Sequence, residues 1–166
     1  KEADRYLSRD FVPNRWVMHT VKHNVFIPSA GVDESNANEH YILWPRDPQK
    51  SAENLWRWAR EHYHVKELGI IITDSHTIPL RRGTLGISLG HYGFTPIRDY
   101  RGEKDIFGRE FVIQIADIAD GLAAATVLAM GEGRETTPLA VITDVAFVEF
   151  TDRPYAPEKP FSSFEI

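Results

Sequence analysis

The chain has 166 residues, no cysteine and a formal net charge of −5 at pH 7, and these values exclude several classes of protein. Without cysteine there is no disulfide, no thiol nucleophile and no thiolate zinc site. The negative charge argues against a broad nucleic-acid-binding surface, and no apolar run approaches the roughly eighteen residues of a membrane span. With 42% hydrophobic residues, we expect one folded domain over residues 1–166, soluble and cytoplasmic.

The first thirty residues predict a short helix followed by a β-hairpin. Residues 1–9 have the composition of the end of a helix. Two β-rich runs, 15–21 and 25–27, flank His23-Asn24, and asparagine tolerates the left-handed conformation that a tight hairpin turn demands. The chain is therefore expected to fold back on itself early, as two antiparallel strands.

A polar loop over residues 30–38 follows the hairpin. Asp33 and Asn36 lie three positions apart in it, close enough for both side chains to face one ligand. Loops of this composition also form as ordinary Asx turns, in which the side chain accepts a hydrogen bond from a nearby backbone N–H. The residues alone favour the turn.

A strand, a helix and a second strand are expected next. Residues 41–44 have strand composition, and Asp47-Pro48 is a typical helix start, with Asp as the N-cap and Pro in the first turn. The predicted helix has one apolar stripe, formed by Ala52, Leu55, Trp56, Ala59 and Tyr63. With the strand at 69–73, this order predicts a right-handed βαβ unit.

The segment Gly69–Ser75 has the strongest strand character in the chain. Residues 70–73 are all β-branched, which suits a strand buried on both faces in the middle of a sheet. Asp74 and Ser75 stand at its carboxyl end, where open α/β sheets gather their ligand sites. The same residue types also cap turns, so the residues alone leave both interpretations open.

The second half of the chain is glycine-rich before it becomes helical. The glycines of 83–102 do not spell a phosphate-binding P-loop, and we interpret them as positions where the backbone turns or approaches another segment closely. Residues 111–115 and 139–142 predict strands, the second one buried. Between them, residues 116–130 predict a largely buried, alanine-rich helix that Gly131 ends.

Five groups of short motifs occur in order over roughly residues 30–142. They are Ala30-Gly31-Val32-Asp33-Glu34-Ser35-Asn36, Asp47-Pro48 with Ser51-Ala52, Ile72-Thr73-Asp74-Ser75 with Pro79 and Arg81, Asp99-Tyr100-Arg101-Gly102 with Asp105 and Gly108, and Ala119-Asp120 with Leu122-Ala123, Met130-Gly131-Glu132 and Pro138. Together they resemble the motifs of the coenzyme F420-0:γ-glutamyl ligases and their relatives. Several independent matches in one order are hard to attribute to chance.

The resemblance implies an activity and a set of site residues. Enzymes of that family use GTP and divalent metal ions to join L-glutamate to a carboxylate. By position, Asp33 and Asp74 would bind one metal ion, and Ser75 and Glu132 a second. Asn36 and one loop would contact the nucleotide. The loop residues are Met130, Gly131, Glu132, Gly133, Arg134, Glu135, Thr136 and Thr137. Such oxygen ligands suit Mg²⁺ or Mn²⁺.

The implied chemistry starts from a carboxylate that does not react with an amine unaided. Transfer of the γ-phosphoryl group of GTP would form an acyl phosphate, which the glutamate amine would attack. Positioning and charge neutralisation would carry the catalysis, because phosphoryl transfer requires little covalent chemistry from the protein. Arg81 and Arg101 are candidates for binding phosphate or carboxylate groups. A surface salt bridge is the alternative for Arg101.

Differences from the family lie beside its best-matched motifs. Leu80 replaces the usual aromatic before Arg81, and residues 91–94 are bulkier than usual. We therefore expect an acceptor other than F420-0, such as a folate-like or phosphorylated metabolite. The family's amino-terminal portion, which carries part of the nucleotide site, is not matched in residues 1–166, so we expect this chain alone to bind GTP weakly.

The expected fold is α+β, with a mixed sheet and packed helices, and the resemblance implies an intertwined homodimer. The alternative to an enzyme is a relative that binds a nucleotide or cofactor without turnover. Retention of all four metal-ligand positions favours the enzyme. No nucleic-acid or membrane partner is expected.

Overall fold

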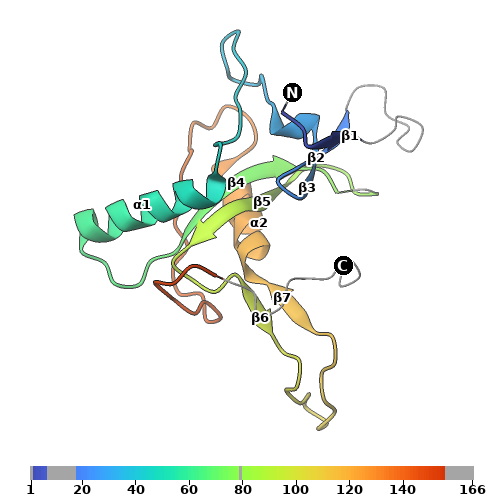
Figure 1. Cartoon of the computed structure of the whole chain (residues 1–166), viewed down its shortest axis with the longest axis vertical. Coiled ribbons are helices and arrows are strands. Elements are labelled where there is room, and N and C mark those ends of the chain that lie inside the picture. The colour runs from blue at the N-terminus through green and yellow to red at the C-terminus, as the bar shows by residue number, and fades with distance from the viewer. Residues whose placement is uncertain (1, 7–17, 79, 156–166) are drawn as a thin grey trace.

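The structure is a computed structural model that describes residues 2–6, 18–78 and 80–155 of the chain. Figure 1 shows two helices packed around a central pair of strands, with a small sheet at one end and a thin two-stranded arm projecting from the other. This arrangement confirms the expected α+β class. The expected mixed sheet does not form in the described residues: their strands make three small sheets, and every pairing is antiparallel.

The amino-terminal sheet contains β1 (Arg5–Tyr6), β2 (His19–Lys22) and β3 (Val25–Pro28), in that spatial order. The β2–β3 hairpin confirms the predicted fold-back, and its turn residues His23 and Asn24 both have positive φ. The predicted helix end is wrong where the structure describes it, because β1 pairs with β2 as a strand. Residues 1, 7–9 and 15–17 of these predictions lie outside the described residues.

After β3 a short 3₁₀ turn, η2 (Ser29–Gly31), leads into the polar loop. The strand expected at residues 41–44 does not form; Ile42 makes only a single antiparallel bridge, to Asp33. Without a strand before the helix there is no βαβ unit, so that prediction was wrong. The segment instead closes the loop on itself, because the backbone groups of Asp33 and Ile42 exchange two hydrogen bonds, at 2.7 and 3.1 Å.

Helix α1 (Pro48–Tyr63) begins where the sequence predicts it. The carboxylate of Asp47 accepts the backbone N–H of Lys50 at 2.8 Å and so caps the first turn. His64, in the left-handed conformation, ends the helix. The start of the helix is therefore fixed by local chemistry that the sequence displays.

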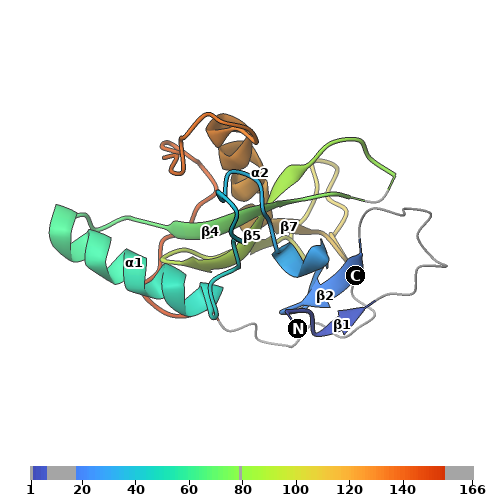
Figure 2. The ribbon, with the colours of Figure 1, turned by 90° about the horizontal axis from the view of Figure 1, so that it is seen from above.

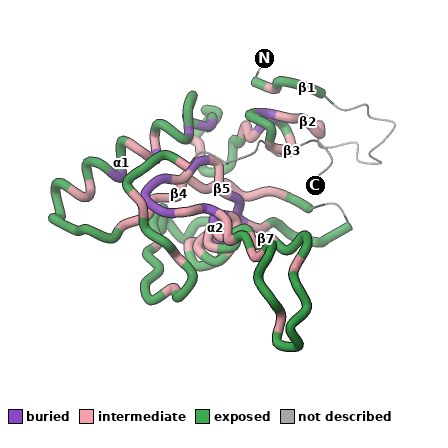
Figure 3. Tube along the Cα trace, turned by 60° about the horizontal axis from the view of Figure 1, so that its bottom comes forward, coloured by how far each residue is buried: buried purple, intermediate pink, exposed green. Residues whose placement is uncertain are grey.

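The buried face of α1 is narrower than its apolar stripe. Ala52 and Trp56 are buried against Tyr92, and the indole N–H of Trp56 donates to the carbonyl oxygen of Leu68 at 2.8 Å. Two other stripe positions, Leu55 and Tyr63, are exposed. The helix thus contacts the central strands along one line only, which Figure 3 shows as isolated buried positions on a coil that is otherwise half-buried or exposed.

The central pair consists of β4 (Ile70–His76) and β5 (Leu85–Tyr92), which run antiparallel. The prediction of a strand at 69–73 is confirmed, although β4 continues through Asp74 and Ser75 to His76. The prediction that this strand lies in the middle of a sheet is wrong for the described residues. Within the described part of the chain β4 pairs with β5 alone, and all seven of its residues are half-buried. Trp44, from the segment before α1, bonds the side chain of Asp74 in β4.

A β-bulge lets the two helices pack on opposite faces of β5. Ile72 pairs with Gly90 and Thr73 with Ser88, so Leu89 is a surplus residue. A Cβ at Gly86 would lie 2.3 Å from the Ala123 carbonyl oxygen in α2. A Cβ at Gly90 would lie within 2.7 Å of backbone atoms at the start of α1. These contacts confirm that the glycines permit close approach, and Figure 2 shows the two helices on either side of the pair.

The arm and the second helix complete the fold. Strands β6 (Ile97–Asp99) and β7 (Ile115–Asp117) form the base of the arm, and α2 (Ile118–Met130) follows directly. The strand predicted at 111–115 was therefore placed too early, with only Ile115 inside β7. Asp117 caps α2 through the backbone N–H of Asp120 at 2.8 Å, which starts the helix two residues later than predicted.

Helix α2 is buried on one side only. Ala119, Ala123 and Val127 face the central strands, whereas Leu128 is 84% exposed. The prediction of a largely buried helix was wrong because alanine content alone does not show how many neighbours surround a helix. Gly131 ends α2 as predicted, with φ of 86° and its N–H donating to the Val127 carbonyl oxygen.

The last described segment returns to the central strands without forming the predicted strand at 139–142. Leu139 and Val141 are exposed, and no strand within the described ranges pairs with them. The segment reaches the end of β5 only later in the chain. There Phe150 forms an isolated antiparallel β-bridge with Phe94, and the backbone N–H of Thr151 donates to the Gly93 carbonyl oxygen at 2.9 Å. Neither α1 nor α2 is both long and apolar enough to cross a bilayer, and the described residues contain no other α-helix.

Candidate functional site

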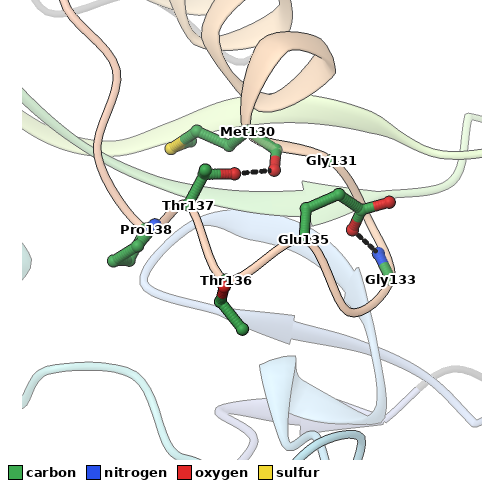
Figure 4. Close-up of a pocket in the computed structure, with 7 residues that line it drawn as sticks. All are labelled: Met130, Gly131, Gly133, Glu135, Thr136, Thr137 and Pro138. Atoms are coloured by element: carbon green, nitrogen blue, oxygen red, sulfur yellow. Dashed lines mark hydrogen bonds between the residues drawn. The ribbon is translucent and has the colours of Figure 1, made fainter.

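A pocket of about 350 Å³ lies where the chain leaves α2. It is lined by Met130, Gly131, Gly133, Glu135, Thr136, Thr137 and Pro138. Figure 4 shows the loop wrapped around this space. Six of these seven residues belong to the loop that the resemblance assigns to the nucleotide. The predicted loop is therefore a concave element in the folded chain.

Two hydrogen bonds hold the loop in shape. The hydroxyl of Thr137 donates to the Met130 carbonyl oxygen, which closes the loop at its base. The carboxylate of Glu135 accepts the backbone N–H of Gly133 at 2.7 Å. That backbone group thus already binds an anionic group, and the loop can present an N–H donor to a carboxylate or phosphate.

The polar loop from the first motif lies against this pocket loop. The side-chain amide of Asn36 donates to the Gly133 carbonyl oxygen at 3.0 Å. Asn36 itself has a φ of 57°, a conformation that asparagine tolerates better than most residues. Two segments that the resemblance assigned to the same ligand are thus joined directly.

The carboxylate of Asp74 is held through both of its oxygens. The indole Nε1 of Trp44 donates to Oδ2 at 2.6 Å, and the backbone N–H of Ser75 donates to Oδ1 at 2.8 Å. Successive side chains leave a strand on opposite faces. Asp74 therefore faces Trp44 and the amino-terminal hairpin, whereas Ser75 shares the opposite face with its pairing partner Gly86, where α2 packs.

The remaining ligand candidates are exposed. One oxygen of Asp33 accepts the backbone N–H of Ser35 at 2.9 Å, the Asx turn that was the alternative interpretation of this loop. Glu132 lies on the pocket loop and points to no hydrogen-bond partner among the described residues. Within those residues, no three or more His, Asp or Glu side chains lie close enough together to hold a metal ion.

The two arginine candidates lie in different surroundings. Arg81 is exposed beside β4, and its backbone N–H donates to the Ile78 carbonyl oxygen. Arg101 lies on the arm, which projects away from the pocket loop in Figure 1, and its guanidinium binds the Asp99 carboxylate at 2.6 Å. The hydrogen bonds from Arg101 lower the pKa of Asp99 to about 2. In this chain Arg101 therefore makes the surface ion pair that was its alternative role.

A polar cluster that the sequence reasoning missed lies between α2 and the central strands. The carboxylate of Asp120 accepts the backbone N–H of Ser88 at 2.7 Å. Burial raises the pKa of Asp120, and the nearby charge of Asp117 adds to the effect. Nδ1 of His76 and the hydroxyl of Ser88 are buried without a partner in the described residues. No local pattern joins residues from two strands and a helix, so only the fold reveals this cluster.

Fold and pocket together define a class: an α+β protein whose loop after the second helix encloses a pocket and donates a backbone N–H to the Glu135 carboxylate. A sequence model of the family described as F420-0:Gamma-glutamyl ligase matches residues 3–144. The chain therefore belongs to the F420-0:γ-glutamyl ligase family, as the motifs predicted.

Curated relatives from several organisms are named coenzyme F420:L-glutamate ligase. A coenzyme F420:L-glutamate ligase of Methanopyrus kandleri is 39% identical over 127 residues, covering 76% of this chain and 50% of the relative. The protein of that name from Methanococcus maripaludis strain S2 is 40% identical, with coverage of 84% and 55%. That of Haloarcula marismortui is 38% identical, with coverage of 80% and 51%. The chain thus spans about half the length of the curated relatives it matches.

Proposed function

We propose that this chain is part of a γ-glutamyl ligase, which joins L-glutamate to a small-molecule carboxylate acceptor with GTP as co-substrate. The observation that carries the proposal is the hydrogen bond from Asn36 to the Gly133 carbonyl oxygen, at 3.0 Å. It joins the first family motif to the pocket loop, which are the two segments proposed to bind the nucleotide. The family and the names of its relatives supply the reaction class.

In the proposed reaction the pocket loop receives the phosphates of GTP. Gly133 donates its backbone N–H to the Glu135 carboxylate at 2.7 Å, and a phosphate oxygen would take the place of that carboxylate. The γ-phosphoryl group passes to the acceptor carboxylate, whose C–O bond then becomes breakable. The glutamate amine attacks the acyl carbon, the amide bond forms and inorganic phosphate leaves. Positioning of the two substrates supplies most of the rate enhancement in such a scheme.

The chain's oxygen donors fit Mg²⁺ or Mn²⁺ in kind. Each carboxylate oxygen of Asp74 accepts its own N–H group. These two bonds fix the plane of the carboxylate and leave each oxygen a further lone pair. Because no three acidic or histidine side chains gather in the described residues, we propose that phosphate oxygens complete the coordination. Asp33 and Asp74 would hold one ion, and Ser75 and Glu132 the other. The ions would neutralise charge that develops on the transferred group.

The acceptor is proposed only as a class. The names of the relatives favour F420, whereas the differences at Leu80 and at residues 91–94 predict another carboxylate. Leu80 is fully exposed and remains available to contact a ligand. Tyr92 and Phe94, in contrast, are 3% and 2% exposed and form part of the core, so their size reflects packing around α1 and the returning segment.

We also propose a homodimer. The tip of the arm exposes Ile106, Phe107, Val112 and Ile113, each more than three-quarters accessible. Apolar side chains gathered on one projecting element are typical of surfaces that another protein covers. A molar mass by light scattering tests this directly, and a strictly monomeric chain would contradict it.

The experiment for the ligase function measures release of GDP and phosphate with GTP and Mn²⁺. Each of F420-0, a folate-type acceptor and no acceptor is tested with and without L-glutamate. We expect turnover only when acceptor and glutamate are both present, and its loss in Asp74→Asn. Asp152→Asn, an exposed carboxylate near the end of the described chain, is the matched control. Nucleotide binding without glutamate-dependent turnover would instead support the non-catalytic alternative.

A further inference from the structure

The indole of Trp44 contacts both segments that carry the proposed first metal site. Trp44 is 9% exposed and belongs to a core cluster with Ile27 and Ile87. Its Nε1 donates to Asp74 Oδ2 at 2.6 Å. On the loop side, the ring lies so close to Gly31 that a Cβ there would be 2.2 Å from Cε2 and Nε1 of the indole. Gly31 precedes Asp33 by two residues, so one side chain touches the loop of one ligand candidate and bonds the other.

The surroundings of the indole fix its orientation. The ammonium group of Lys22 lies 5.3 Å from the ring centroid, and the Lys22 side chain is almost fully buried. The ring of His23 meets the indole edge-on, with centroids 6.4 Å apart. A cation over the ring face favours the indole electrostatically. Because the indole is 9% exposed and lies among these neighbours, it is held with its N–H pointing toward Asp74.

We propose that Trp44 is a positioning residue for the metal site: it fixes the Asp74 carboxylate and holds the Asp33 loop beside it. This inference rests on the proposed metal-dependent function. A carboxylate that accepts two N–H groups cannot rotate freely, so the lone pairs left for a cation keep a set direction. Partners that orient a metal ligand in this way commonly contribute tenfold or more to metal affinity. Trp44 would act on the ion only through Asp74 and would not touch the reacting atoms.

The test compares Mn²⁺ binding by the unaltered chain with that by Trp44→Phe, using electron paramagnetic resonance to count free Mn²⁺. Every sample contains the same concentration of GTP, because phosphate oxygens are proposed to complete the coordination. Phenylalanine keeps an aromatic ring in the core but has no N–H. We expect the dissociation constant to rise by about tenfold or more. Trp58→Phe, which alters an exposed tryptophan on α1, should leave it unchanged. A folded Trp44→Phe chain that binds Mn²⁺ as tightly as the unaltered one overturns the proposal.

A second measurement needs no substitution at Trp44 and no bound metal. The indole N–H proton of Trp44 should resonate downfield of the other tryptophan indoles, because it donates to a carboxylate. Asp74→Asn should move that signal and leave the Trp56 indole in place. An unmoved signal also overturns the positioning role. A third outcome is that the unaltered chain binds no Mn²⁺ while the Trp44 indole signal moves in Asp74→Asn. That outcome contradicts the metal-dependent function, and with it the positioning role that rests on that function.

Discussion

Asn36 and Gly133 stand 97 positions apart in the chain, yet the side-chain amide of one donates to the carbonyl oxygen of the other at 3.0 Å. The bond is exposed, and it joins the loop after the amino-terminal hairpin to the loop after α2. An exposed hydrogen bond of this kind contributes only about 0.5–1.5 kcal/mol to folding. Its importance is that it joins the first loop to Gly133, a residue that lines the pocket.

Asn36→Ala should therefore separate stability from ligand binding. We expect the free energy of unfolding to fall by about 1 kcal/mol or less, while the dissociation constant for GTP rises by roughly tenfold, since a lost charge-assisted bond of about 1.5–3 kcal/mol corresponds to such a factor. Urea unfolding and calorimetric GTP titration measure the two quantities. Asn54→Ala, on the exposed side of α1, is the control. Equal GTP affinity in both variants would remove Asn36 from the nucleotide site.

Two glycine substitutions should change stability in opposite directions. Gly86→Ala places a methyl group 2.3 Å from the Ala123 carbonyl oxygen and 2.5 Å from Val127, and overpacking of this kind costs about 1–3 kcal/mol. Gly121 lies in α2 with nothing within 4 Å of an added Cβ. Gly121→Ala should therefore stabilise by up to about 1 kcal/mol through helix propensity. Denaturant unfolding of both variants measures the sign of each change in the free energy of unfolding. Stabilisation by Gly86→Ala would contradict the packing of α2 on β5.

The His91 side chain should make stability depend on pH near neutrality. Burial lowers the pKa of His91 below its ordinary value of 6.5, with Asp117 partly opposing the shift, and its Nε2 is buried without a partner in the described residues. Between the two pKa values the unfolded chain binds more protons than the folded chain, so stability rises with pH up to about 6.5 and is lost as the pH falls through that window.

Replacing His91 removes this contribution. We expect His91→Gln to show a smaller rise in the free energy of unfolding between pH 5 and pH 8 than the unaltered chain. The exposed His40→Gln should keep the rise. The measurement is urea unfolding at four or more pH values. A rise of the same size in all three chains would show that His91 is not protonated preferentially in the unfolded state.

The ion pair on the arm gives a prediction that needs no stability measurement. Arg101 donates to Asp99 from Nε and Nη2 and also from its backbone N–H, and together these bonds lower the Asp99 pKa to about 2. In Arg101→Gln the Asp99 pKa should rise toward its ordinary value of 3.8, without reaching it, because the backbone N–H remains. Carbon NMR of the Asp99 carboxyl against pH reports the midpoint. Arg109→Gln, on the same arm, should leave it near 2.

Elements with local chemical signals could be predicted from the sequence, and elements defined by distant partners could not. Asp47-Pro48 and His23-Asn24 produced a helix start and a hairpin turn where predicted, because a cap and a left-handed turn need only neighbouring residues. The β-branched run 70–73 produced a strand. Its partners were misjudged, since the same composition suits a strand buried by other strands and one covered by helices.

The candidate site follows the same division. The pocket loop was predicted from the motif at Met130, and the structure shows that this loop lines a pocket. Its contact with a nucleotide remains a prediction. Trp44 was interpreted as one residue of a short strand, because nothing around it in sequence shows that its indole reaches Asp74, thirty positions later. The roles of Asp33, Ser75 and Glu132 as metal ligands remain predictions from the resemblance.

The surplus residue Leu89 in β5 has a consequence for how the family's sequences can vary. Gly86 and Gly90 would point the same way in a regular strand, and the bulge is what turns one toward α2 and the other toward α1. If one residue between these glycines were deleted, Gly86 and Gly90 would face the same helix. The other helix would then meet a side chain at the position where a glycine now permits its close approach. The number of residues from 86 to 90 is therefore constrained more tightly than their identity, and insertions or deletions in functional relatives should fall outside this interval.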